Sequence, residues 1–210
     1  MSQHSSEITL LLAACRPEPD NQLTPLLQEL AGDIDWTRLV EISLEQGVTC
    51  LLCNSLLAAD QSLVPEEIRN AAVVFLENSD TSNQNAADQL SRILTTLDSA
   101  GIAAIPFKGP VLAISAFGRL NLRTFADLDF LIRETQIDTC LSTLRTLGYS
   151  HEWNLSPKQW RAFLDYAGQD LLAGPGLHIE PHWAFAPHTM AWDIDYEQLW
   201  TRASTETLNG

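Results

Sequence analysis

The segment Phe125-Ala126-Asp127-Leu128-Asp129-Phe130-Leu131-Ile132 places two carboxylates two residues apart inside an otherwise apolar, β-prone run. Alternate side chains of a β-strand point to the same face, so Asp127 and Asp129 are predicted to share one face and leave the other to the apolar residues. Two like charges side by side on a strand repel each other, and a bound divalent cation is the usual way to make such a pair favourable. Similar pairs also occur as solvated residues at strand ends. Other parts of the sequence are therefore needed to distinguish a metal site from an exposed pair.

The chain as a whole is acidic. It has 210 residues, a formal net charge of −15 and 45% hydrophobic residues. This length can bury a sizeable core, as one large domain or two small ones. The acidity argues against a broad nucleic-acid-binding surface, which would be basic, but it leaves room for a small anionic substrate held by local cations and metals.

The cysteines and the apolar stretches bear on the cellular compartment. Cys50 and Cys53 have the C-x-x-C spacing of zinc and redox sites, but no second pair completes a zinc site, and apolar helical flanks predict buried thiols. This cysteine usage suits a reducing cytosol, so we expect a cytoplasmic protein. Leu10 to Cys15 resembles the cleavage box of a lipoprotein signal, yet no Lys or Arg precedes it, which favours an amphipathic first helix. No apolar run approaches the ~20 residues of a membrane span.

Helical patterns dominate residues 6–100, and Asp35 is predicted to cap a helix over Trp36–Gln46. Glu66–Ser99 is expected to form one long helix or two, with a break in its polar middle, Glu77–Asp88. From Gly101 onwards short strands and helices alternate. We expect strands over 102–107, 127–133, 149–153, 170–172 and 177–183, the last two joined by a Gly174-Pro175-Gly176 turn, and helices over 111–117, 134–147, 157–167 and 193–203. The sequence thus predicts a helical segment over 1–100 followed by an α/β unit over 101–210.

Three of the chain's 12 basic residues lie close before the aspartate pair. Lys108-Gly109 follows an expected strand, where a glycine lets the backbone approach a ligand and the amides of a helix N-terminus favour phosphate. Arg123 lies four residues before Asp127, and Arg119 lies four residues further upstream. An arginine here either clamps phosphate oxygens or pairs with Asp127.

The run His178-Ile179-Glu180-Pro181-His182-Trp183 would place two histidines and one acid on the same face of a strand. Three interpretations stay open at this point. Glu180 can be a third carboxylate beside the aspartates, or His178 and His182 can bind zinc together with an acid. The third interpretation is an exposed polar strand face with no bound ion.

Several of these motifs occur together in a known family. Phe107-Lys108-Gly109, then Arg123-x-x-x-Asp127-Leu128-Asp129-Phe130, then Leu147-Gly148-Tyr149 and finally Ile179-Glu180-Pro181-His182-Trp183 are the matching runs. On these runs the chain resembles the uncharacterised bacterial nucleotidyltransferase family of the DNA polymerase β-like superfamily, from about Asp33 to Trp200. The Arg-x-x-x-Asp-x-Asp element with the later acid-x-His-Trp is the more specific part, because Lys-Gly turns are common.

The resemblance implies an α+β fold: a polymerase β-like nucleotidyltransferase core, in which helices flank a mixed sheet, preceded by the N-terminal helical segment. It implies that Asp127, Asp129 and Glu180 are the catalytic metal ligands for Mg²⁺ or Mn²⁺, and that Lys108 and Gly109 form the phosphate-binding turn. The superfamily usually has Gly-Gly or Gly-Ser at this turn, and Pro110 removes one backbone donor from it. Members often continue into a C-terminal helical region, so the core over 101–210 is expected to be truncated or short.

The implied activity is transfer of a nucleoside monophosphate from an NTP, such as ATP, to a hydroxyl. Glu180 would also act as general base, Lys108 and Arg123 would neutralise phosphate charge, and His182 would orient Glu180 or contact substrate, with His178 and Arg119 as further candidates. The net charge favours a small-molecule or protein acceptor over tRNA. The alternatives are a catalytically inactive member that binds nucleotide or protein, and a zinc hydrolase that uses His178, Glu180 and His182.

Overall fold

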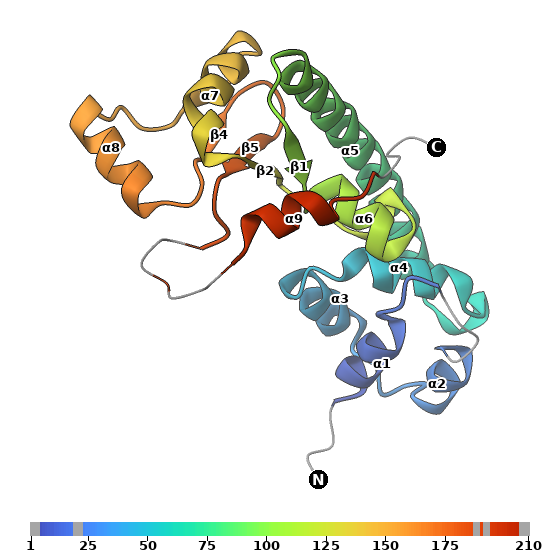
Figure 1. Cartoon of the computed structure of the whole chain (residues 1–210). Coiled ribbons are helices and arrows are strands. Elements are labelled where there is room, and N and C mark those ends of the chain that lie inside the picture. The colour runs from blue at the N-terminus through green and yellow to red at the C-terminus, as the bar shows by residue number, and fades with distance from the viewer. Residues whose placement is uncertain (1–4, 19–22, 187–189, 191–193, 206–210) are drawn as a thin grey trace. The chain divides into compact units, whose positions relative to one another are not determined.

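The computed structural model describes residues 5–18, 23–186, 190 and 194–205. The chain divides into two compact units: Met1–Gln84 with Ala116–Thr124, and Asn85–Ser115 with Phe125–Gly210. Figure 1 shows the order of the elements along the chain. The predicted boundary near residue 100 between a helical segment and a core stays a prediction.

The first unit is helical and contains a core of its own. Its elements are α1 (Ser6–Ala14), α2 (Leu23–Glu29), α3 (Trp36–Glu45), α4 (Thr49–Ala58) and the 3₁₀ helix η1 (Gln61–Leu63). The Asp35 carboxylate accepts a hydrogen bond from the Arg38 amide at 3.0 Å, which confirms the predicted cap of α3. Leucines from several helices fill the core: Leu10, Leu27, Leu39, Leu52 and Leu56.

The two thiols of the C-x-x-C motif lie in α4 and are buried, as the sequence predicted. Burial raises the pKa of both, that of Cys53 to about 12. A thiol with such a pKa stays protonated at neutral pH and is a poor nucleophile and metal ligand. This burial explains the motif as part of a helix face that packs into the interior.

The helix α5 (Glu66–Ser99) is continuous, with no break in its polar middle. Asn83 shows why a polar residue fits there: its Nδ2 donates to the carbonyl oxygens of Leu120 and Arg123, at 2.6 and 2.7 Å. These carbonyls flank the 3₁₀ helix η2 (Leu120–Leu122), so the polar stretch binds a neighbouring loop. Within the described part of the chain, every helix is too short or too polar to cross a lipid bilayer.

The second unit is built around a mixed five-stranded sheet, which confirms the expected α+β class. The sheet order is β1-β2-β5-β4-β3; β2 and β5 run parallel and the other neighbours are antiparallel. The strands are β1 (Ala104–Pro106), β2 (Asp127–Ile132), β3 (Ser150–His151), β4 (Leu172–Ala173) and β5 (His178–His182). The helical elements are α6 (Gly109–Phe117), η3 (Glu134–Gln136), α7 (Ile137–Thr146), α8 (Pro157–Tyr166) and α9 (Tyr196–Arg202).

The element boundaries differ from the prediction at several ends. The helix expected over 134–147 begins as the 3₁₀ turn η3, and the strands expected over 149–153 and 170–172 pair over only two residues each. Asp195 caps α9, so this helix begins later than the expected residue 193, which lies outside the described residues. The predicted glycine turn between β4 and β5 is confirmed, and at Gly174 a Cβ atom would come within 2.3 Å of the Tyr149 ring.

One face of the sheet forms the core of the second unit. Leu128, Phe130 and Ile132 of β2 are buried on this face together with Ile179 of β5. Helices α5 and α7 cover it with apolar side chains: Leu90, Ile93, Leu97, Cys140 and Leu144. Because side chains alternate along β2 and β5, the residues between these apolar positions point to the opposite face.

Candidate functional site

The carboxylates of Asp129 and Glu180 come together because β2 and β5 are parallel neighbours in register. Asp129 is the cross-strand partner of Glu180, and Asp127 is the partner of His178. Cross-strand partners on one face have Cβ atoms about 5 Å apart, close enough for their side chains to interact. The register therefore places side chains far apart in the sequence on one patch of the sheet.

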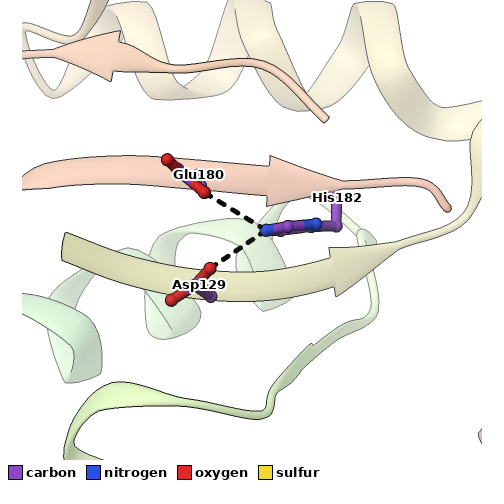
Figure 2. Close-up of side chains that lie close together, drawn as sticks. All are labelled: Asp129, Glu180 and His182. Carbon is purple, nitrogen blue, oxygen red and sulfur yellow. Dashed lines mark hydrogen bonds and ion pairs between the residues drawn. The ribbon is translucent and has the colours of Figure 1, made fainter. Parts of the chain in front are cut away.

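His182 joins these two carboxylates. Its Nε2 lies 3.0 Å from Asp129 Oδ1 and 3.5 Å from Glu180 Oε2, and Figure 2 shows the three side chains converging from β2 and β5. Only 4% of His182 is exposed, so the third interpretation of the histidine run, an exposed polar face, is wrong for this residue. A ligand atom from each of Asp129, Glu180 and His182 lies within 4.8 Å of the others.

Asp129 is the buried centre of this cluster, with 1% of its surface exposed. Besides the contact with His182, its Oδ1 accepts a hydrogen bond from Lys108 Nζ at 2.7 Å. Burial acts to raise the pKa of Asp129, but the hydrogen bonds from His182 and Lys108 outweigh it and hold the pKa below its usual value. The carboxylate is therefore ionised near neutral pH.

Glu180 is shifted in the opposite direction. Burial raises its pKa most, and the negative charges of Asp129 and Asp127 raise it further. His182 and Lys108 act against this rise. The effect of Asp127 on Glu180 places that aspartate in the same electrostatic neighbourhood, although the Asp127 carboxylate is not one of the three converging groups.

The Lys108-Gly109 turn leads from β1 into α6. Gly109 is the first residue of α6 and has a left-handed φ of 54°, which glycine adopts without strain. A Cβ atom added to Gly109 would point towards β2 and lie 3.6 Å from the Asp127 carbonyl oxygen. The N-terminus of α6 thus begins beside the strand that carries the aspartates.

Two further residues of the site were not predicted as functional. Gln169 donates from Nε2 to Glu180 Oε2 at 2.8 Å, which holds that carboxylate in place. The Phe107 ring packs edge-on against the His182 ring, with centroids 5.0 Å apart. Phe107 could have been found as part of the Phe-Lys-Gly run, but Gln169 precedes a very short strand and has no pattern that marks it.

The donor set fits a hard divalent cation. Asp129 Oδ2 is buried and has no hydrogen-bond partner among the described residues, which is costly for a carboxylate oxygen unless an ion or water satisfies it. Carboxylate oxygens are the preferred ligands of Mg²⁺ and Mn²⁺, and a histidine nitrogen is compatible with Mn²⁺ and Zn²⁺. His178 is not one of the three converging residues. Its Nε2 lies 3.4 Å from Glu152 Oε1 instead.

Arg119 and Arg123, the two arginines shortly before the aspartate pair, belong to the first unit. Arg119 donates to Asn54 Oδ1 at 2.7 Å. Arg123 follows η2, and its Nη1 is buried without a hydrogen-bond partner among the described residues. Their predicted contacts with phosphate stay predictions.

A comparison with known families identifies the class of protein. A family model described as "uncharacterised nucleotidyltransferase" matches residues 32–210, and the chain therefore belongs to this family. This result confirms the resemblance seen in the sequence motifs. No curated protein and no solved structure gives a significant match to the chain.

Proposed function

We propose that this protein transfers a nucleoside monophosphate from an NTP to a hydroxyl group, with Mg²⁺ or Mn²⁺ held by Asp127, Asp129 and Glu180. The observation that carries the proposal is the register of β2 and β5, which makes Asp129 and Glu180 direct partners on the face away from the core. The unpartnered Asp129 Oδ2 supports a bound cation at this point. Membership of the nucleotidyltransferase family supports the nucleotide as substrate.

Lys108 and the N-terminus of α6 would bind the phosphates. Lys108 Nζ lies beside Asp129 and its side chain is 46% exposed, so it can turn towards a triphosphate without losing a buried position. Amides at a helix N-terminus and a positive φ at Gly109 suit a phosphate oxygen that approaches the backbone closely. Pro110, the next residue of this turn, contributes no N–H.

The reaction would be an in-line displacement at the α-phosphorus. The acceptor oxygen forms a bond to this phosphorus, the bond to the oxygen that bridges to the β-phosphate breaks, and pyrophosphate leaves. Glu180 would take the proton of the acceptor hydroxyl, a role that its raised pKa favours. A bound divalent cation would neutralise phosphate charge and lower the pKa of that hydroxyl. His182 and Gln169 would position Asp129 and Glu180.

The acceptor is the less defined substrate. A net charge of −15 disfavours a long polyanion such as tRNA, because binding such a polymer depends on many cationic contacts. We propose a small molecule or a protein side chain as the acceptor. We also propose residues 101–210 as the catalytic core and residues 1–100 as a helical segment that precedes it.

Calorimetric titration of each NTP, with Mg²⁺, with Mn²⁺ and with EDTA, tests the proposal. The wild type is expected to bind at least one NTP only when a divalent cation is present. Asp129→Asn, which keeps the shape of the side chain, is expected to weaken this binding at least tenfold. Asp165→Asn is the matched control, because Asp165 is an exposed carboxylate on α8. Absence of NTP binding by the wild type, or binding that ignores the metal, would contradict the proposal.

Transfer itself separates an enzyme from a binding protein of the same fold. The wild type is incubated with α-labelled and, separately, γ-labelled NTP in a cell extract. Label from the α-phosphate alone should appear on an acceptor, and pyrophosphate should be released. Metal-dependent binding without any transfer would favour the inactive alternative, and stoichiometric zinc in the purified protein would favour a zinc site.

A further inference from the structure

A polar cavity lies in the second unit, away from the carboxylate cluster. It has a volume of about 450 Å³ and is lined by α7, by β3 and by the segment that leads into α8. This volume lies within the range of known small-molecule sites. The side chains that give it chemical character are Arg145, His151, Trp153 and Trp160.

Two polar lining residues, Arg145 and His151, form a chain of contacts with Asp170 behind them. The Asp170 carboxylate, 1% exposed, lies 2.6 Å from His151 Nδ1, and Arg145 Nη2 lies 3.1 Å from His151 Nε2. A guanidinium can only donate, so His151 Nε2 accepts and Nδ1–H donates to Asp170. His151 is thereby fixed in one orientation, and it holds the Arg145 guanidinium at the cavity.

Arg145 has unused hydrogen-bonding capacity. In the described residues its guanidinium makes no ion pair with a carboxylate, so most of its five N–H donors remain available. A guanidinium is planar and matches a carboxylate or phosphate group with two parallel hydrogen bonds. Asp138 also lines the cavity, which limits a ligand to a single anionic group near Arg145.

Two tryptophans form another part of the wall. Trp160 packs edge-on against His151 at 5.0 Å and stacks on Phe163 at 5.4 Å, which fixes the position of its ring. Trp153 also lines the cavity. This residue is 50% exposed, although tryptophan side chains are usually more buried than this. Indole rings bind flat ring systems by stacking and edge contacts.

The cavity is on the other side of the sheet from the carboxylate cluster. His151 pairs with Leu172, Leu172 pairs with Ile179, and Ile179 pairs with Leu128, so their side chains share the core face. Glu180 and Asp129 are one position along and point to the opposite face. A ligand in the cavity therefore cannot be the NTP or the acceptor bound at the cluster.

We propose that this cavity is a second binding site, which takes a small aromatic molecule with one phosphate or carboxylate group. The inference does not depend on the transfer reaction. The test follows the indole N–H signals of ¹⁵N-labelled protein during titration with phenyl phosphate, in EDTA so that no metal-dependent site contributes. Trp→Phe variants assign the signals.

The signals of Trp153 and Trp160 are expected to shift and saturate with one dissociation constant, while those of Trp183 and Trp200 stay in place. Arg145→Met should weaken binding at least tenfold, equivalent to about 1.4 kcal/mol. Arg161→Met is the matched control, because Arg161 is an exposed arginine of α8 outside the cavity lining. Well-dispersed indole signals from Arg145→Met show that this variant is folded.

Two comparison ligands test whether the site needs both the aromatic ring and the anionic group. Phenol and inorganic phosphate alone should each bind more weakly than phenyl phosphate. The proposal is overturned if Arg145→Met binds as tightly as the wild type, if inorganic phosphate matches phenyl phosphate, or if no saturation occurs at millimolar concentration.

Discussion

Lys108 Nζ lies 2.7 Å from Asp129 Oδ1, on the carboxylate at the centre of the cluster. The lysine thus provides positive charge at a place where a divalent cation would also bind. Asp129 keeps a second oxygen, Oδ2, without a partner among the described residues. A cation that binds there competes electrostatically with the lysine.

Lys108→Met should have opposite effects on two ligands. Without the ammonium group, Mn²⁺ alone is expected to bind several-fold more tightly, because like charges no longer repel. Binding of NTP with Mn²⁺ should weaken, because phosphate loses a cation. Calorimetry of Mn²⁺ and of NTP measures both. Lys158→Met is the control, since Lys158 is the other lysine of the chain and is exposed on α8. If the affinities for Mn²⁺ and for NTP both rose or both fell in Lys108→Met, Lys108 would not both repel the metal and attract the phosphate.

Glu180→Gln should stabilise the metal-free protein at neutral pH. Burial and the charges of Asp129 and Asp127 raise the pKa of Glu180 above its ordinary value of 4.5. The folded protein therefore holds this proton more tightly than the unfolded chain does, and the stability contribution of Glu180 falls as pH rises through the raised pKa. Removing the charge should increase the free energy of unfolding by roughly 0.2 to 1 kcal/mol, the range for cross-strand pairs.

Urea denaturation in EDTA checks this expectation at about pH 7 and again below about pH 4, where the wild-type carboxyl is already protonated. The gain should be present at the higher pH and absent at the lower. Asp165→Asn should show neither effect. A gain that is the same at both pH values would mean that it does not come from the charge of Glu180.

Gly109→Ala should cost about 1 kcal/mol of stability, because alanine is strained at a φ of 54°. Gly118→Ala, at a φ of 73° and with no atom near the added Cβ, should cost a similar amount. Chemical denaturation compares the two. Only Gly109→Ala should also weaken NTP binding, since the proposed phosphate contact is at Gly109. Equal nucleotide affinity in both variants would remove Gly109 from the phosphate site.

Gly168→Ala should be more damaging than either. A Cβ atom there would lie 2.6 Å from the Ala184 carbonyl oxygen, and the amides of Trp183 and Ala184 both bond to Gly168 O at 2.8 Å. The crowding is against backbone that these bonds hold, so we expect a loss of about 2 kcal/mol or more. Gly101→Ala is the comparison, because it has left-handed backbone strain and no crowding, whereas Gly168 has crowding and no positive φ. A smaller loss in Gly168→Ala than in Gly101→Ala would refute the crowding argument.

Much of the second unit could be predicted because its local signals agree with each other. The alternation in the Asp127–Ile132 run gave the strand and its two faces, and Gly174-Pro175-Gly176 gave the turn before β5. The middle of α5 was ambiguous because a polar helix surface and a break have the same composition. Only the tertiary hydrogen bonds of Asn83 distinguish them.

The candidate site was less accessible to sequence reasoning because its geometry depends on pairing between distant segments. The contacts between His182, Lys108 and Asp129 require the parallel register of β2 and β5 and the position of β1 beside them. Gln169 could not be found at all, since its role depends on an isolated bridge to His182. The residue types indicated which side chains could bind a metal, but the pairing of the strands determines which of these side chains lie in contact.

Gln169 and Asp170 are consecutive residues that serve opposite faces of the sheet: one holds Glu180 and the other holds His151. A single-residue insertion or deletion just before them would exchange these directions, because side chains alternate along an extended chain. It would bring a third carboxylate to the cluster of Asp129, Glu180 and His182 and remove the acid behind His151. The number of residues before Gln169 therefore affects both sites. A substitution can alter the site on one face alone, but a shift in register alters the sites on both faces at once.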